Sequence, residues 1–294
     1  MFSFKFKKNT WFIVFVASLL GILFQNQATQ LYGYLAYLYM GIATLGVLSV
    51  NLNGSYMELR RDKKSIPFLI FVNLINFLII FAFKNHFSEN IFTGLLMAVL
   101  VSNSLISLFI TNLFNTSIYK TFVLTVFSNL FLNLITFYLI DAYVLSLGID
   151  LFNIVSFFLQ FILIPFILSY FISVFKFKER IYEYGNNISI ILLALINFSL
   201  IGNFWPIIKA NYNLVFYLVL VLTCISILNI LMSFFIYKNN NDRISFISLF
   251  AFKNAFLLIF LFEKLMGSDV MLPIIAMVIV NIIMLLPSRY LKDF

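Results

Sequence analysis

The sequence predicts an all-α polytopic membrane protein of about ten transmembrane helices, and three observations support this fold class. Of the 294 residues, 63% are hydrophobic and only 10% are charged, and 39 of them are phenylalanine. The apolar residues occur in runs of about 20, the length that a helix needs to cross the hydrocarbon core of a bilayer. The basic residues are concentrated in alternate connections between these runs. A chain of this composition cannot surround a soluble core with a polar surface.

The boundaries of each span follow from polar residues, because a span in lipid must satisfy its own backbone hydrogen bonds. Examples are "ELRRDKK" between the second and third spans, "KNHFSEN" between the third and fourth, and "FNTS" between the fourth and fifth. In chain order, we expect spans at residues 10–25, 31–50, 66–83, 92–113, 117–140, 151–175, 187–206, 212–237, 244–262 and 270–288.

The distribution of basic residues predicts the orientation, because Lys and Arg are retained on the cytoplasmic side. Only Lys84, Lys209 and Lys264 fall on the opposite side, and Lys253 lies within a span. We therefore expect a multi-pass protein of a cell (inner) membrane, with both termini cytoplasmic. The net charge of +8 is dispersed, which indicates anionic membrane lipid and no nucleic acid as a partner. The other 15 basic residues lie at 5–8, 60–64, 120, 176–180, 238–243 and 289–292.

Ten spans divide into two halves of opposite orientation, residues 1–145 and 146–294, as expected for inverted five-helix repeats. Each half contains an apolar segment interrupted by polar residues, "MAVLVSNSLISLFITNLFNTS" and "SLFAFKNAF". Paired interruptions of this kind are typical of broken helices whose ends form a binding site at the bilayer midplane. The alternative is that these Ser and Asn residues only form hydrogen bonds between helices.

Lys253 lies at the centre of the apolar stretch "ISFISLFAFKNAFLLIFLF". A lysine at that depth costs about 2.5–3.5 kcal/mol, so it is expected to face a cavity and to have a partner. No Asp or Glu falls in the middle of a predicted span. Neutral oxygens on neighbouring helices and an anionic substrate are the remaining candidates. The alternatives are an amine kept neutral by burial, a side chain that extends toward the interface, or a purely structural role.

Several segments together resemble the bile acid:sodium symporter superfamily, which is related to arsenite and auxin-type carriers. They include "GLLMAVLVSNSLISLFITNLFNTSIYKTFVLTVFSNL" and "ISLFAFKNAFLLIFLFEKLMGSDVMLPIIAMVIVNII", similar to the fourth and fifth and to the ninth and tenth family helices. The resemblance implies secondary carriers with ten helices in inverted repeats, in which broken helices 4 and 9 cross. It also implies a core domain at 66–140 plus 212–288 and a panel domain at 10–50 plus 151–206.

The resemblance places this chain's residues on the family's sodium ligands, and several of them differ. The pair in the fourth-helix break becomes Ser107 and Leu108, and the hydroxyls of the fifth helix become Thr121 and Thr125. The carboxylate of the ninth helix becomes a leucine, Leu249.

Lys253 and Asn254 complete the motif of the ninth helix, and a glutamine of the third helix becomes Asn73. Sodium needs several oxygen ligands, and it would repel a lysine ammonium about 4 Å away by about 4 kcal/mol at an effective dielectric constant of 20. Loss of sodium coupling is therefore expected.

The expected function is secondary transport of a small organic anion by alternating access, with the ammonium of Lys253 replacing the coupling cation. Proton exchange at this lysine would instead give a proton-linked carrier or a uniporter. The sequence is also compatible with a sodium-coupled symporter, a non-transport membrane subunit and a membrane enzyme acting on lipid-linked substrates. Enzyme motifs are absent from the sequence, and no cofactor or metal is expected. The candidate substrate- or ion-binding residues are Lys253, Asn254, Thr121, Thr125, Ser107, Asn73, Ser128 and Asn103.

Overall fold

The computed structural model describes residues 9–50, 64–102, 104–113, 118–135, 138, 151–174, 178–262 and 268–288. In this part of the chain every regular element is a helix, as the composition predicts. In chain order the helices are α1 (Thr10–Leu23), α2 (Gln25–Tyr32), α3 (Leu35–Leu48), α5 (Ser65–Ala82), η3 (Lys84–His86), α6 (Glu89–Leu100), α7 (Ile106–Leu113), α8 (Ile118–Phe127), η4 (Ser128–Leu132, a π-helical turn), α10 (Leu151–Val174), α11 (Lys178–Ala210), α12 (Tyr212–Ile236), α13 (Asn240–Ala251), α14 (Ala255–Phe262) and α15 (Ser268–Ser288).

Four helical segments within the described residues are long and apolar enough to cross a membrane, and α1 with α2 would make a fifth span. Shorter apolar helices accompany them. The outward faces of α5 and α12 carry large apolar side chains, including Phe71, which is 50% exposed, and Phe235, which is 87% exposed. Faces of this kind suit contact with lipid and would be unfavourable in water. The four segments are Ser65–Ala82, Ile118–Ile135, Tyr184–Ala210 and Tyr212–Ile236.

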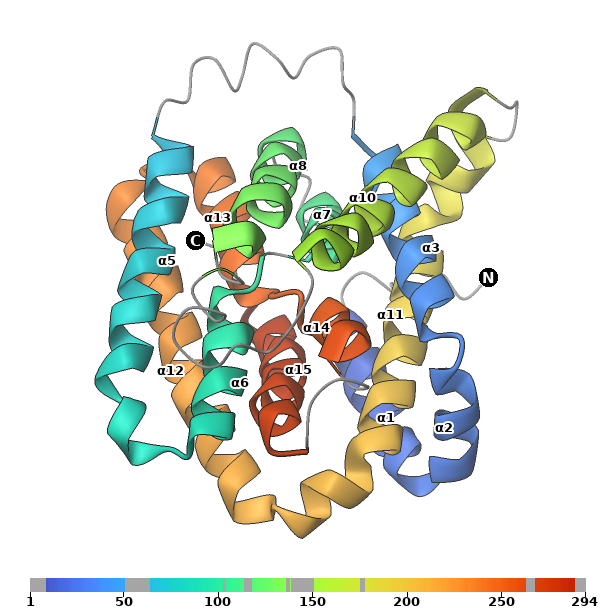
Figure 1. Cartoon of the computed structure of the whole chain (residues 1–294). Coiled ribbons are helices and arrows are strands. Elements are labelled where there is room, and N and C mark those ends of the chain that lie inside the picture. The colour runs from blue at the N-terminus through green and yellow to red at the C-terminus, as the bar shows by residue number, and fades with distance from the viewer. Residues whose placement is uncertain are drawn as a thin grey trace.

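The helices pack as two groups, which occupy different parts of the molecule in Figure 1. In the first helix group, α11 packs against α1, α2 and α3, and α10 packs against α3. In the second helix group, α15 packs against α6, α12 and α14, while α13 packs against α7, α8 and α12, and α5 packs against α6. The two groups touch where α3 contacts α7 and where α1 and α11 contact α15.

Two glycines explain the close packing within the first helix group. A Cβ atom at Gly21 of α1 would lie 2.2 Å from the carbonyl oxygen of Phe198 in α11. A Cβ atom at Gly202 would lie 2.4 Å from the Cβ atom of Ala28 in α2. Only glycine permits this approach, and small residues at such crossings are typical of helix packing in membranes.

Two expectations about the first and seventh spans were wrong in detail. Residues 26–30 were expected to form a connection, but they lie in α2, which is bent by 108° from α1. The polar α2 is stabilised by packing on α11, a tertiary contact that hydropathy does not reveal. Helix α11 also extends well beyond the expected 187–206, because helical hydrogen bonds continue where the apolar run has ended.

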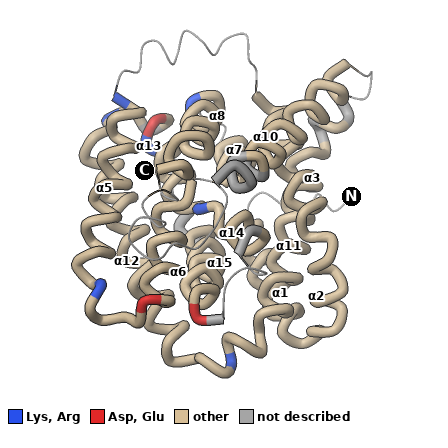
Figure 2. The backbone as a smooth tube through the Cα atoms, in the orientation of Figure 1, with Lys and Arg blue, Asp and Glu red and all other residues tan. Residues whose placement is uncertain are grey.

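Charged residues lie mostly toward two opposite ends of the helical bundle, with one basic residue near its middle (Figure 2). Among the basic side chains that the structure describes, only Lys120 and Lys253 are buried. The ammonium of Lys120 forms an ion pair with Asp242 at 2.9 Å and also lies over the ring of Tyr237. Lys253 has no carboxylate partner among the described residues, so these two buried lysines differ fundamentally.

Candidate functional site

Two helix interruptions meet inside the second helix group. One lies between Leu100, where α6 ends, and Ile106, where α7 begins. The other lies between Ala251, where α13 ends, and Ala255, where α14 begins. The unwound segments fall inside the two polar-interrupted stretches that the sequence singles out.

The two unwound segments are joined by backbone hydrogen bonds. The amide of Ser104 donates to the carbonyl of Phe252 at 2.9 Å, and the amide of Asn254 donates to the carbonyl of Ser102 at 3.0 Å. These bonds replace helical partners that the interruptions remove. Irregular backbone at membrane depth is tolerated only when it is buried in protein in this way.

The first interruption contains no glycine or proline, and serine and asparagine side chains provide hydrogen bonds to its backbone instead. The amide of Ser102 donates to Oδ1 of Asn133 at 2.8 Å. The amide of Ile106 donates to the hydroxyl oxygen of Ser104 at 3.2 Å, at the start of α7. Such side chains offer the backbone alternatives to helical hydrogen bonds, which accounts for the break at "VSNSL".

Lys253 occupies the second interruption and is only 2% exposed. Its ammonium donates to Oδ1 of Asn73 at 3.5 Å and to the carbonyl of Val101 at 3.3 Å. Both distances lie beyond the usual range for N–H···O hydrogen bonds, so both bonds are weak. The buried lysine therefore has neutral partners at long distance.

The carbonyl of Val101 gives Lys253 partial electrostatic compensation. Val101 is the C-cap residue of α6, and its ψ of 147° turns its carbonyl away from the helical direction. This carbonyl therefore acts as a single neutral acceptor. A buried ammonium with neutral acceptors favours a further anionic partner.

Asn254 connects the two helix groups. Its Oδ1 accepts a hydrogen bond from the hydroxyl of Tyr39 in α3 at 3.1 Å, and its Nδ2 donates to Oδ1 of Asn129 at 3.4 Å. The Tyr39 hydroxyl also lies 3.5 Å from the Ser104 hydroxyl. A conformational change between the groups would have to break these contacts.

A polar stripe runs along α8 and η4 at intervals of four residues, through Thr121, Thr125, Asn129 and Asn133. Residues four apart lie on the same face of a helix. Oδ1 of Asn129 accepts from the Ser102 hydroxyl at 2.7 Å, and Nδ2 of Asn133 donates to the same hydroxyl at 3.0 Å. The stripe therefore holds the first interruption in place.

Hydroxyl groups pair with one another at the α7 end of this stripe. The hydroxyls of Ser107 and Thr125 are 3.2 Å apart, and Thr111 donates to Thr121 at 3.1 Å. Thr111 also shares a hydrogen bond with Ser248 of α13 at 2.7 Å. These hydroxyls are satisfied within the protein, and they tie α7, α8 and α13 together.

The resemblance aligns Leu108 and Leu249 with sodium ligands of the family. Both side chains are apolar, and both are surrounded by apolar groups. Both are fully buried. Leu249 belongs to an apolar cluster that includes Leu69 and Leu124. Leu108 packs against α3, where a Cβ atom added to Gly46 would lie 3.2 Å from the Cβ atom of Leu108. Neither position offers an oxygen side chain to a cation.

A narrow, mostly apolar cleft lies beside the interruptions. Its polar lining residues are Ser104, Asn197, Lys253 and Asn281, from both interruptions and from α11 and α15. We call it the lysine cleft. The amide nitrogen of Asn281 donates to the carbonyl of Lys253 at 3.1 Å, which positions the interrupted backbone. The cleft is bordered by both helix groups, because α11 belongs to the first group and α15 to the second.

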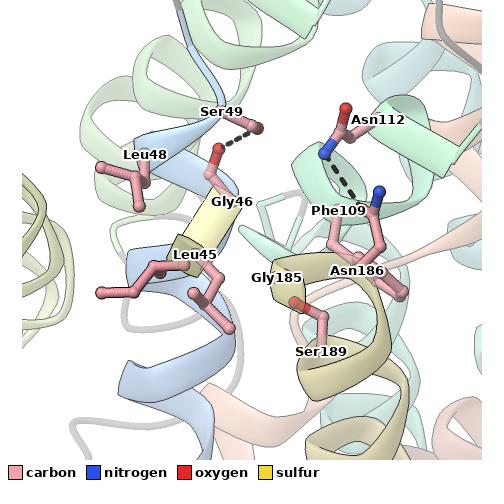
Figure 3. Close-up of a pocket in the computed structure, with 10 residues that line it drawn as sticks. Leu45, Gly46, Leu48, Ser49, Phe109, Asn112, Gly185, Asn186 and Ser189 are labelled. Atoms are coloured by element: carbon pink, nitrogen blue, oxygen red, sulfur yellow. Dashed lines mark hydrogen bonds between the residues drawn. The ribbon is translucent and has the colours of Figure 1, made fainter. Parts of the chain in front are cut away.

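A second narrow cleft also lies between the groups, where α3, α7 and α11 meet (Figure 3). Nδ2 of Asn112 in α7 donates to Oδ1 of Asn186 in α11 at 3.1 Å, and Figure 3 shows this bond across the cleft. Gly46 and Gly185 also line it, so small residues leave the space open.

The structure brings most of the predicted site residues into one polar region. Lys253 contacts Asn73 directly, Asn254 contacts the α8–η4 stripe, and the hydroxyl of Ser107 contacts that of Thr125. Thr121 lies at the far end of the stripe, paired with a hydroxyl of α7, and Ser128 is fully buried. Of the predicted site residues that the structure describes, only Lys253 is among those that line the lysine cleft. Asn103 lies outside the described residues.

The residues of the polar region that were not predicted from the sequence include Tyr39, Asn133, Asn197 and Asn281. Asn133 continues the four-residue period of the stripe, so that spacing could have identified it. Tyr39, Asn197 and Asn281 are single polar residues in separate helices, and only the packing of those helices brings them to the interruptions. Among the described residues, no group of three or more His, Cys, Asp or Glu side chains could hold a metal ion.

No protein-family model matches the chain, and no curated protein matches its sequence.

Proposed function

We propose that this protein is a membrane carrier that moves a small organic anion by alternating access, without sodium, and that Lys253 supplies the positive charge for the anion. The observation that carries the proposal is the environment of this lysine. Its ammonium is buried between two helix interruptions and has two long bonds to neutral oxygens, and the residue borders a cleft between two helix groups. A mobile anion is the simplest partner for such a charge.

The proposed architecture has ten transmembrane helices as two inverted repeats, residues 1–145 and 146–294, of the bile acid:sodium symporter type. Each half would contribute one broken helix, α6–α7 in the first and α13–α14 in the second. The contact pattern supports a panel domain at 10–50 plus 151–206 and a core domain at 66–140 plus 212–288, because the first and second helix groups follow the same division. The alternation of basic residues supports cytoplasmic termini in a cell membrane.

Alternating access requires two rigid parts that move against each other around a central site. The clefts between the helix groups support this motion, since each cleft is lined by residues of both groups. The contacts across the boundary include two polar ones, Tyr39 with Asn254 and Asn112 with Asn186, beside the apolar packing of α3 on α7. Polar contacts of this kind are modest in energy and can be exchanged during a transport cycle.

The absence of sodium coupling is supported by two features of the polar region. Leu108 and Leu249 are buried among apolar groups, and the hydroxyls of Ser107, Thr121 and Thr125 pair with other hydroxyls of the protein. A sodium ion would need these oxygens as ligands and would face the ammonium of Lys253.

Uptake of radiolabelled pyruvate, succinate and 4-methylpentanoate into proteoliposomes tests the proposal. Wild type, Lys253→Gln and the control Lys84→Gln, which removes an exposed lysine, are compared in sodium and in potassium buffers. We expect saturable uptake by wild type and the control in both buffers. Uptake by Lys253→Gln should fall by about 10- to 100-fold, the value of a charge-assisted hydrogen bond.

Each contrary result identifies a different error. Full uptake by Lys253→Gln contradicts the role of the lysine. Uptake that requires sodium restores the sodium-coupled symporter. No uptake by wild type, together with copurification of a stoichiometric partner, favours a membrane subunit.

A further inference from the structure

The hydroxyl of Tyr39 reaches both helix interruptions from the other helix group. Tyr39 lies in α3 of the first helix group and is 1% exposed. Its hydroxyl donates to Oδ1 of Asn254 in the α13–α14 interruption at 3.1 Å. It also lies 3.5 Å from the hydroxyl of Ser104 in the α6–α7 interruption. One side chain of the first group therefore contacts both unwound segments of the second group.

The two parts that this contact joins are each held together independently of it. The unwound segments are linked to each other by two backbone hydrogen bonds, of 2.9 and 3.0 Å. Helix α3 packs against α10 and α11 of its own group. The Tyr39 hydroxyl therefore connects two units that can each move as one body.

The ring of Tyr39 is fixed by contacts that do not involve its hydroxyl. It forms an edge contact with Phe161 of α10, with ring centroids 5.7 Å apart, and a tilted contact with Phe256 of α14 at 6.2 Å. Aromatic pairs prefer separations in this range. A phenylalanine at this position would keep both contacts, so the effect of the hydroxyl can be tested by itself.

The region around this contact is closed to water. Lys253, Asn254 and Ser104 are all buried, and the narrow lysine cleft beside them is lined mostly by apolar residues of both groups. An anion from solution can reach the ammonium only if the helix groups separate. Separation at this point breaks the bond between Tyr39 and Asn254. The amide oxygen then lacks a donor until water or a ligand replaces the phenol, and an unpaired buried acceptor is unfavourable.

We infer that Tyr39 is a gate of the carrier. Its hydroxyl holds the two helix groups together over the interruptions in the closed state, and release of Asn254 opens the path to Lys253. This inference rests on the proposed function, because a gate requires a carrier with open and closed states. Tyr39 is a positioning residue in this role, since it acts through Asn254 and Ser104 and needs no contact with the anion.

Modification of a buried cysteine tests the gate without any transported substrate. Leu193 of α11 is buried and lines the lysine cleft, so Leu193→Cys reports separation of the groups. The exposed native Cys224 is first removed by Cys224→Ala. The probe is 2-sulfonatoethyl methanethiosulfonate, a small anion that reacts with thiolates, added to the purified full chain in detergent. Because a buried thiol reacts only while it is open to water, its rate follows the population of the open state.

Two variants in this background remove the bond between the groups from opposite sides, Tyr39→Phe and Asn254→Leu. We expect each to raise the modification rate about three-fold or more, the value of an average interhelical hydrogen bond. The double variant should not exceed Asn254→Leu, because both changes remove the same bond. The matched control is Tyr237→Phe, which removes a buried phenol hydroxyl that contacts Ser65 within the second group. The control should leave the rate unchanged.

An unchanged rate in Tyr39→Phe would overturn the gate. An equal rise in Tyr39→Phe and Tyr237→Phe would also overturn it, because such a rise reflects loosening of the whole protein. If Tyr39→Phe does not fold, Asn254→Leu decides in the same way. None of these results depends on anion uptake, so failure of the gate is distinguishable from failure of the proposed carrier, which Lys253→Gln tests.

Discussion

The polar stripe of α8–η4 and the lysine cleft are neighbours, yet they satisfy their polar groups very differently. In the stripe, Asn129 and Asn133 form hydrogen bonds of 2.7–3.0 Å with Ser102 and with carbonyls of their own helix. Around the lysine cleft, the bonds of Lys253 are 3.3 and 3.5 Å long, and the amide oxygens of Asn197 and Asn281 have no partner. The stripe therefore satisfies its polar groups within the protein more fully than the residues around Lys253 do.

The largest effect on stability should come from removing the centre of the stripe with Asn129→Leu. Asn129 bonds to Ser102, Asn254 and the carbonyl of Thr125, and interhelical bonds in membrane proteins contribute about 0.6 kcal/mol each. We expect a loss of about 2 kcal/mol, measured by reversible unfolding in mixed micelles. The matched control is Asn76→Leu, because Asn76 is fully buried and neither of its amide atoms has a partner. An equal loss in both variants would contradict the distinction between paired and unpaired amides.

The two buried lysines should respond in opposite directions to replacement by methionine. Lys120→Met leaves Asp242 without its ion-pair partner, so we expect a loss of about 1.5 kcal/mol, as for a hydrogen bond to a charged group. Lys253→Met removes a buried amine with weak partners, so stability should be unchanged or increased. Unfolding of both variants under one condition measures the difference. A large loss in Lys253→Met would show that this lysine holds the interruptions together.

The contact between Asn112 and Asn186 should be worth less, because it lies in a partly exposed cleft between the helix groups. A double-mutant cycle with Asn112→Leu and Asn186→Leu should give a coupling energy of about 0.6 kcal/mol. If this bond must break during transport, each single variant should also change the uptake rate. A zero coupling energy would exclude the contact as a link between the groups.

The smallest expected effect is that of sodium. Replacing potassium chloride with sodium chloride at constant ionic strength should leave the melting temperature of wild type unchanged, since a ligand stabilises only the state that it binds. The variant Leu249→Glu introduces a carboxylate at the position that the resemblance aligns with the carboxylate sodium ligand of the family. Sodium stabilisation of wild type would show that the paired hydroxyls can open to hold a cation.

Much of the fold could be predicted from the apolar runs and from the polar residues that separate them. The positions of α5, α12 and α15 follow from hydropathy, and both interruptions follow from serine, asparagine and lysine inside apolar segments. Helix α2 could not be predicted, because its polar sequence is held by packing on α11. The length of α11 was also missed, since a helix need not end where the apolar run ends.

Composition and local pattern determine that this chain is helical, that several of its helices can cross a membrane, and that Lys253 lies at a helix break. Those properties depend on hydrophobicity and on short-range competition for backbone hydrogen bonds. Tertiary packing alone decides which groups surround the lysine. Tyr39, Asn197 and Asn281 come from helices far apart in sequence, and their contribution depends on how two helix groups meet around the interruptions.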